Sequence, residues 1–540
     1  MSNAETVYQL FAETAALYPG NDCLVATAMA GRAYYPDGLT FTYSEVRDRA
    51  GELAAAYRAA GYGVGHRVAL LLENRPEFHL HWLALNELGV SIVPLAPALA
   101  PEELTYQLGH ADVVLAVIVQ ERVDELSVIA ARCESPFPVI NANNLPETMP
   151  RPRYLAKTNS PGLETECALL YTSGTTGQPK GCVLNNYYFL NAGRWYLEAG
   201  GGMEISPGAE RLLSPLPLHH ANALAISSMA MLTSGGCMIM VDRFHPTSWW
   251  CDVTDTRATI IHYLGIMPPL LLNLAPGPYD RSHCVKFGAG AGIDPEHHII
   301  FEERFGFPLV EGWGMTEVAM PVWASWEPRQ INTRAMGRVL SGCEVRVHDE
   351  EDTPVLVDTV GELVLRAVGP DRMRGLFSGY LKDPVATDEA WRGGWFHTGD
   401  AVRQDAGGVI YFVDRIKNII RRSGENIAAA EIEAVLQADE RVAQAAVIAV
   451  ADELRQEEVM ACIRLAPNVM KGLETARALQ DQCLARLAYY KAPAYILFVD
   501  RLPTTGTQKI QKTKLFATDI DPRTVPKCYD LVKRKKRPKG

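Results

Sequence analysis

Apolar residues recur along the first part of the chain with two different spacings. From Ser44 to Ala60 they return every three or four positions, which predicts an amphipathic helix. Its apolar face comprises Val46, Ala50, Leu53, Ala54 and Tyr57. Arg67 to Leu72 is a short continuous apolar run, as in a buried strand, and Pro76 to Leu88 returns to the helical spacing.

Short apolar runs alternating with helical segments continue through the next two hundred or so residues. The further runs are Val113–Val119, Glu210–Pro217, Cys237–Val241, Thr259–Leu264 and Val285–Gly288. Strands separated by helices are typical of mostly parallel sheets with helices on both faces. We therefore expect an α/β fold, with a large amino-terminal domain of mostly parallel sheets flanked by helices.

The pattern changes near residue 336. Val345–His348, Gly361–Arg366 and Val409–Val413 are short alternating runs separated by Gly, Pro and Asp, which predicts a small β unit. Helical and extended patterns return after Lys417, so we place a boundary there. We expect a large domain, a small α+β domain and a basic tail, over residues 1–416, 417–520 and 521–540.

Composition excludes several classes of protein. The net charge of −11 over 540 residues argues against a nucleic-acid partner. Eleven cysteines without a CxxC pair favour reduced thiols and a cytoplasmic protein. No apolar run is long enough to predict a membrane span, and the acidic amino-terminal segment does not look like a signal peptide. The basic run from Lys533 to Lys539 is expected to be a solvated tail.

The most informative segment runs from Tyr171 to Gly181. Five hydroxyl-bearing residues and three glycines share its 11 positions with Lys180. Glycines let backbone N–H groups approach an anion, hydroxyls donate to phosphate oxygens, and lysine adds a positive charge. The composition alone would equally suit a flexible loop, and the order of residues is not that of the Walker motif.

This segment resembles the phosphate loop of the adenylate-forming superfamily, which comprises acyl-CoA synthetases, peptide-synthetase adenylation domains and firefly-type luciferases. The superfamily's other motifs follow in the expected order, so the resemblance covers about residues 10 to 515. Gly288–Asp294, Arg304–Gly306 and Glu311–Glu317 look most similar to carnitine/crotonobetaine-type CoA ligases.

The resemblance implies an ATP and acyl pocket in the large domain. The residues expected to hold the phosphates are Thr172, Ser173, Gly174, Thr175, Thr176, Gly177 and Lys180. His220 is expected beside the acyl group, with His219 in the place of a phenylalanine. Zinc is a poor alternative for this pair, because adjacent side chains diverge and no third ligand follows.

Two further motifs complete this pocket by resemblance. Gly288, Ala289 and Gly290 are expected to line the adenine and acyl sites, and Trp313 with Gly314 to lie against the adenine. Thr316 is expected to donate to the α-phosphate, and Glu317 to bind Mg²⁺ as a hard oxygen ligand.

The remaining implied residues fall later in the chain. Asp400 and Arg415 are expected to contact the ribose, and Lys417 to be the hinge of a mobile carboxy-terminal domain. Ser423, Gly424 and Glu425 resemble the loop that walls the pantetheine tunnel, whereas Arg421 and Arg422 could equally be surface charges. Lys509 matches the catalytic lysine that completes the adenylation site, although Gln508 replaces the usual glycine before it.

The implied reaction joins a carboxylic acid to coenzyme A, using ATP and Mg²⁺, through an acyl-adenylate. A small polar acid is favoured because His219, His220 and Asn222 poorly suit a fatty tail. A homodimer is common in the family. The alternatives are an enzyme that loads a carrier protein or another acceptor, a non-catalytic nucleotide sensor, and a luciferase-type oxygenase.

Overall fold

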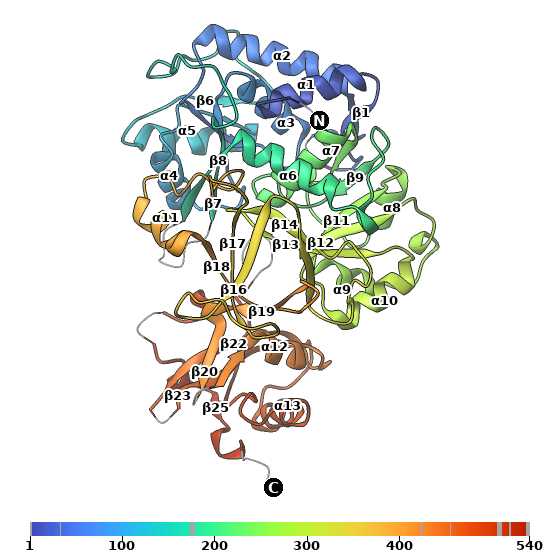
Figure 1. Cartoon of the computed structure of the whole chain (residues 1–540), viewed down its shortest axis with the longest axis vertical. Helices are drawn as coiled ribbons and strands as arrows, with labels where there is room; N and C mark the ends of the chain where they lie inside the picture. Colours follow the sequence, from blue (N-terminus) through green and yellow to red (C-terminus); the bar gives the residue numbers. More distant parts are fainter. Residues whose placement is uncertain are drawn as a thin grey trace. The chain divides into compact units, whose positions relative to one another are not determined.

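The computed structural model divides into two units, each described here by itself (Figure 1). The residues that the structure describes are 3–32, 34–172, 179–422, 425–453, 455–504, 510–517 and 520–535. The amino-terminal unit comprises Met1–Val345, Val364–His397 and Gly408–Ile410. The carboxy-terminal unit comprises Arg346–Leu363, Thr398–Gly407 and Tyr411–Gly540.

The first sheet of the amino-terminal unit is parallel except at one end. In order its strands are β6 (Val139–Asn141), β5 (Leu115–Ile118), β3 (Arg67–Leu71), β4 (Ser91–Pro94), β7 (Glu166–Thr172) and β8 (Lys180–Asn185). Only β7 and β8 are antiparallel neighbours among these pairs. The predicted phosphate loop therefore joins two paired strands of a hairpin.

A second sheet of the same unit is parallel in its middle and antiparallel towards both ends. In order its strands are β2 (Leu39–Thr42), β1 (Asp22–Ala26), β10 (Cys237–Met240), β9 (Arg211–Ser214), β11 (Ile260–Leu264), β12 (Phe287–Ala291), β13 (Leu309–Met315), β14 (Ala319–Trp323) and β15 (Ala335–Val339). The pairs from β1 to β13 are parallel. The β13–β14 pair turns the chain back, which places the segment around Glu317 between two antiparallel strands.

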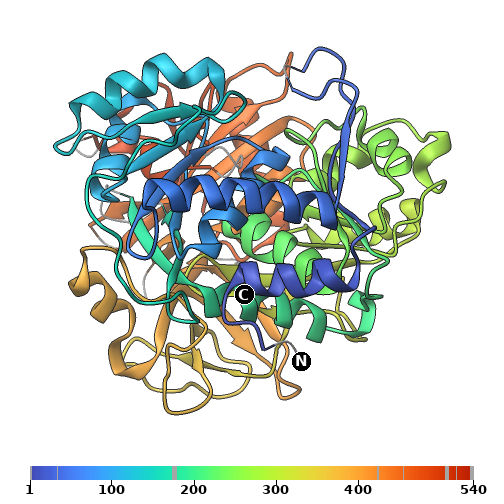
Figure 2. The same ribbon diagram turned by 90° about the horizontal axis from the view of Figure 1, so that it is seen from above.

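Helices cover these sheets. They are α1 (Val7–Leu17), α2 (Tyr43–Ala60), α3 (Pro76–Glu87), α4 (Pro101–His110), α5 (Val123–Arg132), α6 (Asn186–Glu198), α7 (Ser228–Ser234), α8 (Trp249–Asp255), α9 (Met267–Leu272), α10 (Pro295–Phe305) and α11 (Pro384–Ala390). Figure 2 shows α1 and α2 running side by side. Within the described ranges, no helix is both long and apolar enough to cross a membrane.

Helix α2 shows how the sequence sets these elements. Thr42 caps its first turn: its hydroxyl accepts from the Glu45 backbone N–H, and the Glu45 carboxylate accepts from the Thr42 backbone N–H. Gly61, at φ 97°, ends the helix in the left-handed conformation that glycine adopts without strain. The predicted apolar face is buried except for Leu53, which is half-buried.

The chain passes between the two units within four strands. They are β16 (Cys343–His348), β17 (Gly361–Ala367), β18 (Phe396–Gln404) and β19 (Ile410–Arg415). Three of these match the short strands predicted for this part of the sequence.

The carboxy-terminal unit contains a six-stranded sheet and two helices. The strand order is β21 (Glu425–Ala428), β20 (Ile419–Arg422), β23 (Gln456–Leu465), β24 (Tyr495–Phe498) and β25 (Cys528–Asp530), with β22 (Val442–Asp452) also paired to β23. Helices α12 (Ala429–Gln437) and α13 (Leu473–Arg486) bury Ile432, Leu436 and Leu479 against it.

The architecture confirms the α/β class and the mostly parallel sheets, while the boundary at 416/417 stays a prediction. Within the basic run, Lys533 and Arg534 are exposed, whereas the Lys535 side chain is 1% exposed in an ion pair with Glu458, so the expectation of a solvated run is wrong at Lys535. Apolar residues before the run explain this packing, since strand β25 pairs with β24 and Leu531 is buried.

Candidate functional site

The β7–β8 hairpin presents the two described ends of the predicted phosphate loop. Thr172 and Lys180 are opposite each other in the register of the strands. Gly181 follows, and a Cβ there would meet the Leu169 side chain at 3.1 Å, so glycine is needed for close strand packing. The predicted residues Ser173, Gly174, Thr175, Thr176 and Gly177 lie outside the described residues.

Tyr380 joins Lys180 and Glu317 in one cluster. The Lys180 ammonium lies 4.9 Å from the centre of the Tyr380 ring, and the Tyr380 hydroxyl donates to Glu317 Oε1 at 2.9 Å. Burial, followed by the charge of Glu317, raises the pKa of Tyr380 well above its ordinary value, so the phenol stays a donor. Sequence reasoning missed Tyr380.

The backbone around this cluster is also fixed. The Tyr188 hydroxyl donates to the Thr316 carbonyl oxygen at 2.9 Å, and the Phe377 N–H donates to the Glu317 carbonyl oxygen at 2.8 Å. The Leu381 N–H donates to the Gly181 carbonyl oxygen, which ties the segment carrying Tyr380 to β8. Thr316, Glu317 and Lys180, which the motifs placed in one site, therefore do come together.

The Glu317 carboxylate suits the binding of Mg²⁺ with a nucleotide. Its side chain is buried, and Mg²⁺ is commonly held by one or two carboxylates together with substrate phosphates and water. In the part of the chain that the structure describes, no group of three or more His, Cys, Asp and Glu forms a metal cage. Glu317 therefore fits a Mg²⁺ that arrives with ATP.

The predicted adenine-binding residues are built into β12 and β13. Gly288, Ala289 and Gly290 are buried, and a Cβ on Gly290 would lie 2.3 Å from the Tyr263 carbonyl oxygen. Gly314 likewise leaves no room for a side chain, since its Cβ would meet the Ala319 carbonyl oxygen at 2.0 Å. Strand packing thus explains these glycines without a ligand. Trp313 is 6% exposed, so little of its ring surface is open.

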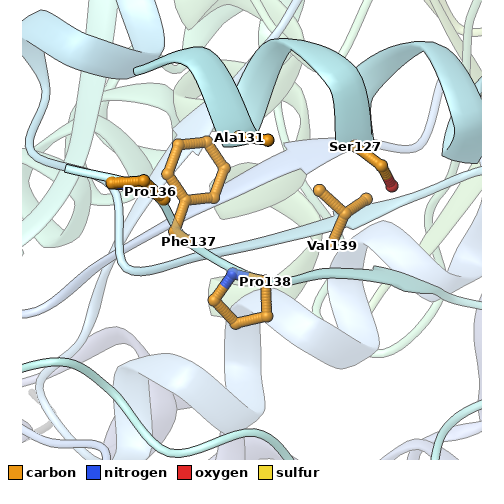
Figure 3. Close-up of a pocket in the computed structure, with 6 residues that line it drawn as sticks. All are labelled: Ser127, Ala131, Pro136, Phe137, Pro138 and Val139. Carbon is orange, nitrogen blue, oxygen red and sulfur yellow. The ribbon is translucent and has the colours of Figure 1, made fainter. Parts of the chain in front are cut away.

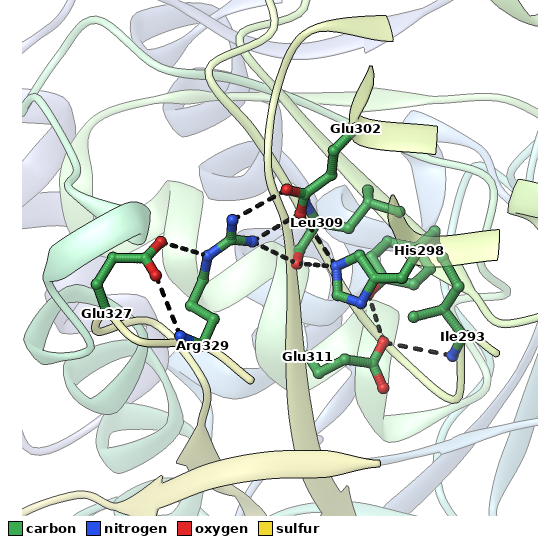
Figure 4. A network of polar contacts seen from close by, with 8 residues as sticks. Ile293, His298, Glu302, Leu309, Glu311, Glu327 and Arg329 are labelled. Atoms are coloured by element: carbon green, nitrogen blue, oxygen red, sulfur yellow. Dashed lines mark hydrogen bonds and ion pairs between the residues drawn. The ribbon is translucent and has the colours of Figure 1, made fainter. Parts of the chain in front are cut away.

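A half-buried carboxylate, Glu311, holds the turn that follows these glycines (Figure 4). It accepts from the Tyr263 hydroxyl at 2.5 Å and from the backbone N–H groups of Gly292 and Ile293 at 2.8 and 3.4 Å. Burial raises the pKa of Glu311, against the lowering effect of these donors. Glu311 precedes the predicted Gly-Trp-Gly motif and was not recognised from the sequence.

The network in Figure 4 continues towards the surface through Glu302 and Arg329. Arg329 binds both carboxylate oxygens of Glu302, at 2.7 and 2.9 Å, and also the exposed Glu327 at 2.8 Å. Burial alone would raise the pKa of Glu302, but hydrogen bonds from His298 and Arg329 outweigh it and lower the pKa to about 2. This part of the network is a structural ion pair on α10.

The predicted histidine motif leads directly into a π-helix, Asn222–Ser227. The His219 and His220 rings lie 4.4 Å apart, and burial, followed by the charge of His220, lowers the pKa of His219 to about 3. The Asn222 side-chain oxygen is buried and accepts no hydrogen bond from the described residues. π-helical turns frequently occur at functional sites, which adds to the case for this segment.

Buried side chains fix the π-helix. The Ser227 hydroxyl donates to the Asn222 carbonyl oxygen, so it must accept from His262 Nδ1 at 2.7 Å. His262 Nε2 then accepts from the Tyr196 hydroxyl at 2.9 Å. This arrangement requires a neutral imidazole, in agreement with the burial that lowers the pKa of His262 to about 3.

Asp400 and Arg415 form an ion pair within the carboxy-terminal unit. Asp400 Oδ1 lies 2.6 Å from Arg415 Nε, and the exposed fractions of the side chains are 1% and 41%. Asp414 accepts from the backbone N–H groups of Arg415 and Ala430, which fixes the start of α12 beside this pair. Burial, followed by the charge of Arg415, lowers the pKa of the Lys417 ammonium.

The β20–β21 hairpin carries the predicted pantetheine loop. Arg422 is buried against Glu458, so it is a structural residue, whereas Arg421 is exposed and contacts Glu350. Glu425 is exposed and pairs with Arg422 in the register of the hairpin. The predicted residues Ser423, Gly424 and Lys509, with Gln508, lie outside the described residues.

Two surface pockets lie away from these residues. One, of about 400 Å³, opens between α5 and the segment that leads to β6 (Figure 3), and its lining consists of Ser127, Ala131, Pro136, Phe137, Pro138 and Val139. A second, of about 280 Å³, lies beside Trp250 and Arg304. The first offers one hydroxyl and otherwise apolar surface, which does not suit an anionic nucleotide.

Comparison with known proteins matches most of the chain to one family. Residues 11–381 match the AMP-binding enzyme family, and residues 431–509 match the AMP-binding enzyme C-terminal domain. A sulfoacetate–CoA ligase from Cupriavidus necator is 31% identical over 95% of this chain and 97% of its own length. A crotonobetaine/carnitine–CoA ligase from Salmonella paratyphi A is 26% identical over 88% and 93%.

Solved structures share the fold. ATP-bound MatB from Rhodopseudomonas palustris aligns with a TM-score of 0.78 at 24% identity, over 94% of this chain and 98% of that one. The o-succinylbenzoate CoA synthetase from Bacillus subtilis, solved with its acyl-adenylate intermediate, aligns with a TM-score of 0.79 over the same shares.

Proposed function

We propose that this chain, which belongs to the AMP-binding enzyme family, joins a small carboxylic acid to coenzyme A with ATP, through an acyl-adenylate. Family membership confirms the superfamily and the enzyme class that the motifs predicted. The cluster of Lys180, Tyr380 and Glu317 beside the phosphate-loop hairpin is the observation that carries the assignment of the site.

The first half-reaction is opposed by repulsion between two negatively charged reactants. A carboxylate must attack the α-phosphate of a polyanion, and the residues of the cluster reduce the repulsion. Lys180 supplies a positive charge at the end of the loop, and the Thr316 hydroxyl donates to the α-phosphate as charge develops there. Tyr380 holds Glu317 in place, and Mg²⁺ bound at Glu317 with ATP supplies further charge neutralisation. Lys509 completes the site.

Motif residues of each unit are assigned to the nucleoside. In the amino-terminal unit, Gly288 to Gly290 and Trp313 line the adenine site, with the turn after Gly290 fixed by Glu311. In the carboxy-terminal unit, Asp400 accepts from the ribose hydroxyls, and Arg415, paired with it at 2.6 Å, orients that carboxylate.

The second half-reaction needs a thiol, which coenzyme A brings. Two of the chain's buried cysteines are unsuited to nucleophilic roles: burial raises the pKa of the Cys462 thiol to about 12, and that of the Cys182 thiol well above its ordinary value. Glu425 of β21, with Ser423 and Gly424 of the same motif, lines the path of the pantetheine, and Lys417 is the hinge.

The acid is small and polar. The names of two relatives, a sulfoacetate–CoA ligase and a crotonobetaine/carnitine–CoA ligase, indicate short acids that bear a second charged group. The π-helix supports the same class, since the Asn222 side-chain oxygen is buried without a partner among the described residues and the neutral His219 lies nearby. Buried polar groups of this kind favour a substrate that can hydrogen-bond to them.

A pyrophosphate-release assay tests this proposal directly. The purified enzyme with ATP and Mg²⁺ is given sulfoacetate, crotonobetaine, acetate and the linear acids from hexanoate to dodecanoate. We expect turnover with one of the short acids, and release of AMP that depends on coenzyme A. Turnover that instead requires an acyl carrier protein, with no thioester formed on coenzyme A, would replace the proposed acceptor.

A further inference from the structure

A buried carboxylate in the carboxy-terminal unit is shared by two cations from distant parts of the chain. Glu458 is fully buried, and Arg422 Nε lies 2.9 and 2.8 Å from its two oxygens. The Lys535 ammonium lies 2.6 Å from Glu458 Oε1 and donates to the Tyr490 carbonyl oxygen at 2.9 Å. The Val459 N–H also donates to Glu458 Oε1. We call the side chains of Glu458, Arg422 and Lys535 the Glu458 cluster.

Lys535 reaches this cluster because the end of the chain is folded onto the sheet. Strand β25 pairs with β24, the Leu531 N–H donates to the Ala494 carbonyl oxygen, and Leu531 is buried. Arg534 donates to Gln480 at 3.0 Å. The contacts run continuously from Cys528 to Lys535, so the lysine is placed by specific packing and not by general attraction to an acidic surface.

The cluster carries one excess positive charge away from water. Sharing one carboxylate between two buried cations is unfavourable compared with a single pair. Burial lowers the pKa of Lys535 to about 8, and the attraction of Glu458 only partly offsets it. Adding the charge of Lys535 to the Arg422–Glu458 ion pair costs folding free energy. This points to a role for Lys535 other than stability.

Arg422 connects the cluster to the predicted pantetheine loop. It is the last residue of β20, directly before Ser423 and Gly424, and pairs with Glu425 in the hairpin. Arg422 also pairs with Gln456 of β23, and its side chain is held by Glu458. Any displacement of Glu458 is therefore transmitted through Arg422 to the end of the hairpin that carries Glu425.

On the basis of the function proposed above, we propose that Lys535 is a positioning residue for thioester formation. By holding Glu458 against Arg422, it fixes the part of the β20–β21 hairpin that carries Glu425, the described residue of the motif assigned to the pantetheine of coenzyme A. The acyl-adenylate step, which uses Lys509 and the amino-terminal unit, does not depend on this contact.

The test separates the two half-reactions in matched variants. K535M keeps the length and apolar stem of the lysine and removes its charge, whereas K533M removes an exposed charge two residues earlier. K535R restores a charged donor. ATP–pyrophosphate exchange measures adenylation, and thioester formation from supplied acyl-adenylate measures the KM for coenzyme A.

We expect K535M to retain exchange within about twofold of the wild type and to raise the KM for coenzyme A by about tenfold, the factor that corresponds to about 1.4 kcal/mol. K533M should match the wild type, and K535R should recover most of the loss. K535M that matches K533M, or that loses both half-reactions in parallel, overturns the proposal.

A folding defect is handled by a second variant. If K535M lacks exchange activity and a cooperative thermal transition, K535Q, which can still donate to the Tyr490 carbonyl oxygen, takes its place under the same criteria. A wild type that exchanges pyrophosphate but forms no thioester on coenzyme A overturns the proposed function, and this inference with it. The wild-type assay therefore tells the two failures apart.

Discussion

Replacing Glu311 by glutamine should weaken ATP binding specifically. Glu311 is half-buried and accepts from three donors: the Tyr263 hydroxyl at 2.5 Å, the Gly292 N–H at 2.8 Å and the Ile293 N–H at 3.4 Å. The substitution keeps the shape and removes the charge. Its amide group brings a new donor to a place where every neighbour is already a donor, so at least one contact is lost and the turn after Gly290 is released.

The size of the effect follows from these contacts. A hydrogen bond to a charged group contributes about 1.5–3 kcal/mol and a neutral one about 1 kcal/mol, and a buried donor without a partner costs about 1–3 kcal/mol. Burial disfavours the charged carboxylate and raises the pKa of Glu311, so replacing it with a neutral amide recovers part of this loss of binding free energy. A net loss of about 2 kcal/mol corresponds to roughly a 30-fold increase in the KM for ATP.

Glu327 provides the matched control. Its side chain is 75% exposed and contacts Arg329 in the same network, so E327Q should change the KM for ATP by less than about twofold. Both variants are assayed by pyrophosphate exchange at saturating acid, and then at saturating ATP with varied acid. If E311Q behaves like E327Q, or raises the KM for the acid as much as that for ATP, Glu311 does not act through the turn after Gly290.

Four further outcomes are expected. Lys509→Ala should abolish pyrophosphate exchange and spare thioester formation from supplied acyl-adenylate, and Lys417→Pro should do the converse because proline fixes a hinge dihedral; equal loss of both steps in either variant would contradict the assigned roles. Burial lowers the pKa of His79 and His262 to about 3, whereas the ordinary pKa of histidine is 6.5. Between these two values the unfolded state binds more protons than the folded state. The free energy of unfolding should therefore fall as the pH falls through this window. Urea denaturation at pH 7 and 5 should show a loss of about 2 kcal/mol per histidine, and a flat profile would contradict it. For a closed polar pocket, kcat/KM should fall as linear acids lengthen beyond about six carbons, whereas an apolar tunnel would gain about 0.8 kcal/mol per methylene.

Periodicity predicted the layered part of the fold well, because those strands are buried on both faces and their apolar runs are continuous. The helix predicted from Ser44 begins one residue earlier in the structure, where Thr42 supplies the cap. The burial of Lys535 was missed for the opposite reason. Charges dominate the composition of the basic run, while the contacts that place Lys535 come from single residues such as Leu531, which meets a strand more than thirty residues away.

The order of the motifs predicted part of the site but not the residues that hold that part in place. Thr316, Glu317 and Lys180 come together, as do Asp400 and Arg415, because each belongs to a motif with fixed spacing. Tyr380 reaches Glu317 from 63 positions away, through a segment paired with β8. No local pattern marks such a residue, because its role arises only when the strands are assembled.

Strand β25 also has a consequence for how the protein behaves in concentrated solution. It covers the backbone edge of β24, whose central residues Ile496 and Leu497 are buried and apolar. An open edge of this kind is a template for pairing with other chains, which leads to aggregation. β25 replaces it with an edge of three residues that ends at Asp530, too short and too charged to recruit a partner strand. Shortening the chain before Cys528 would therefore expose this edge and cost solubility.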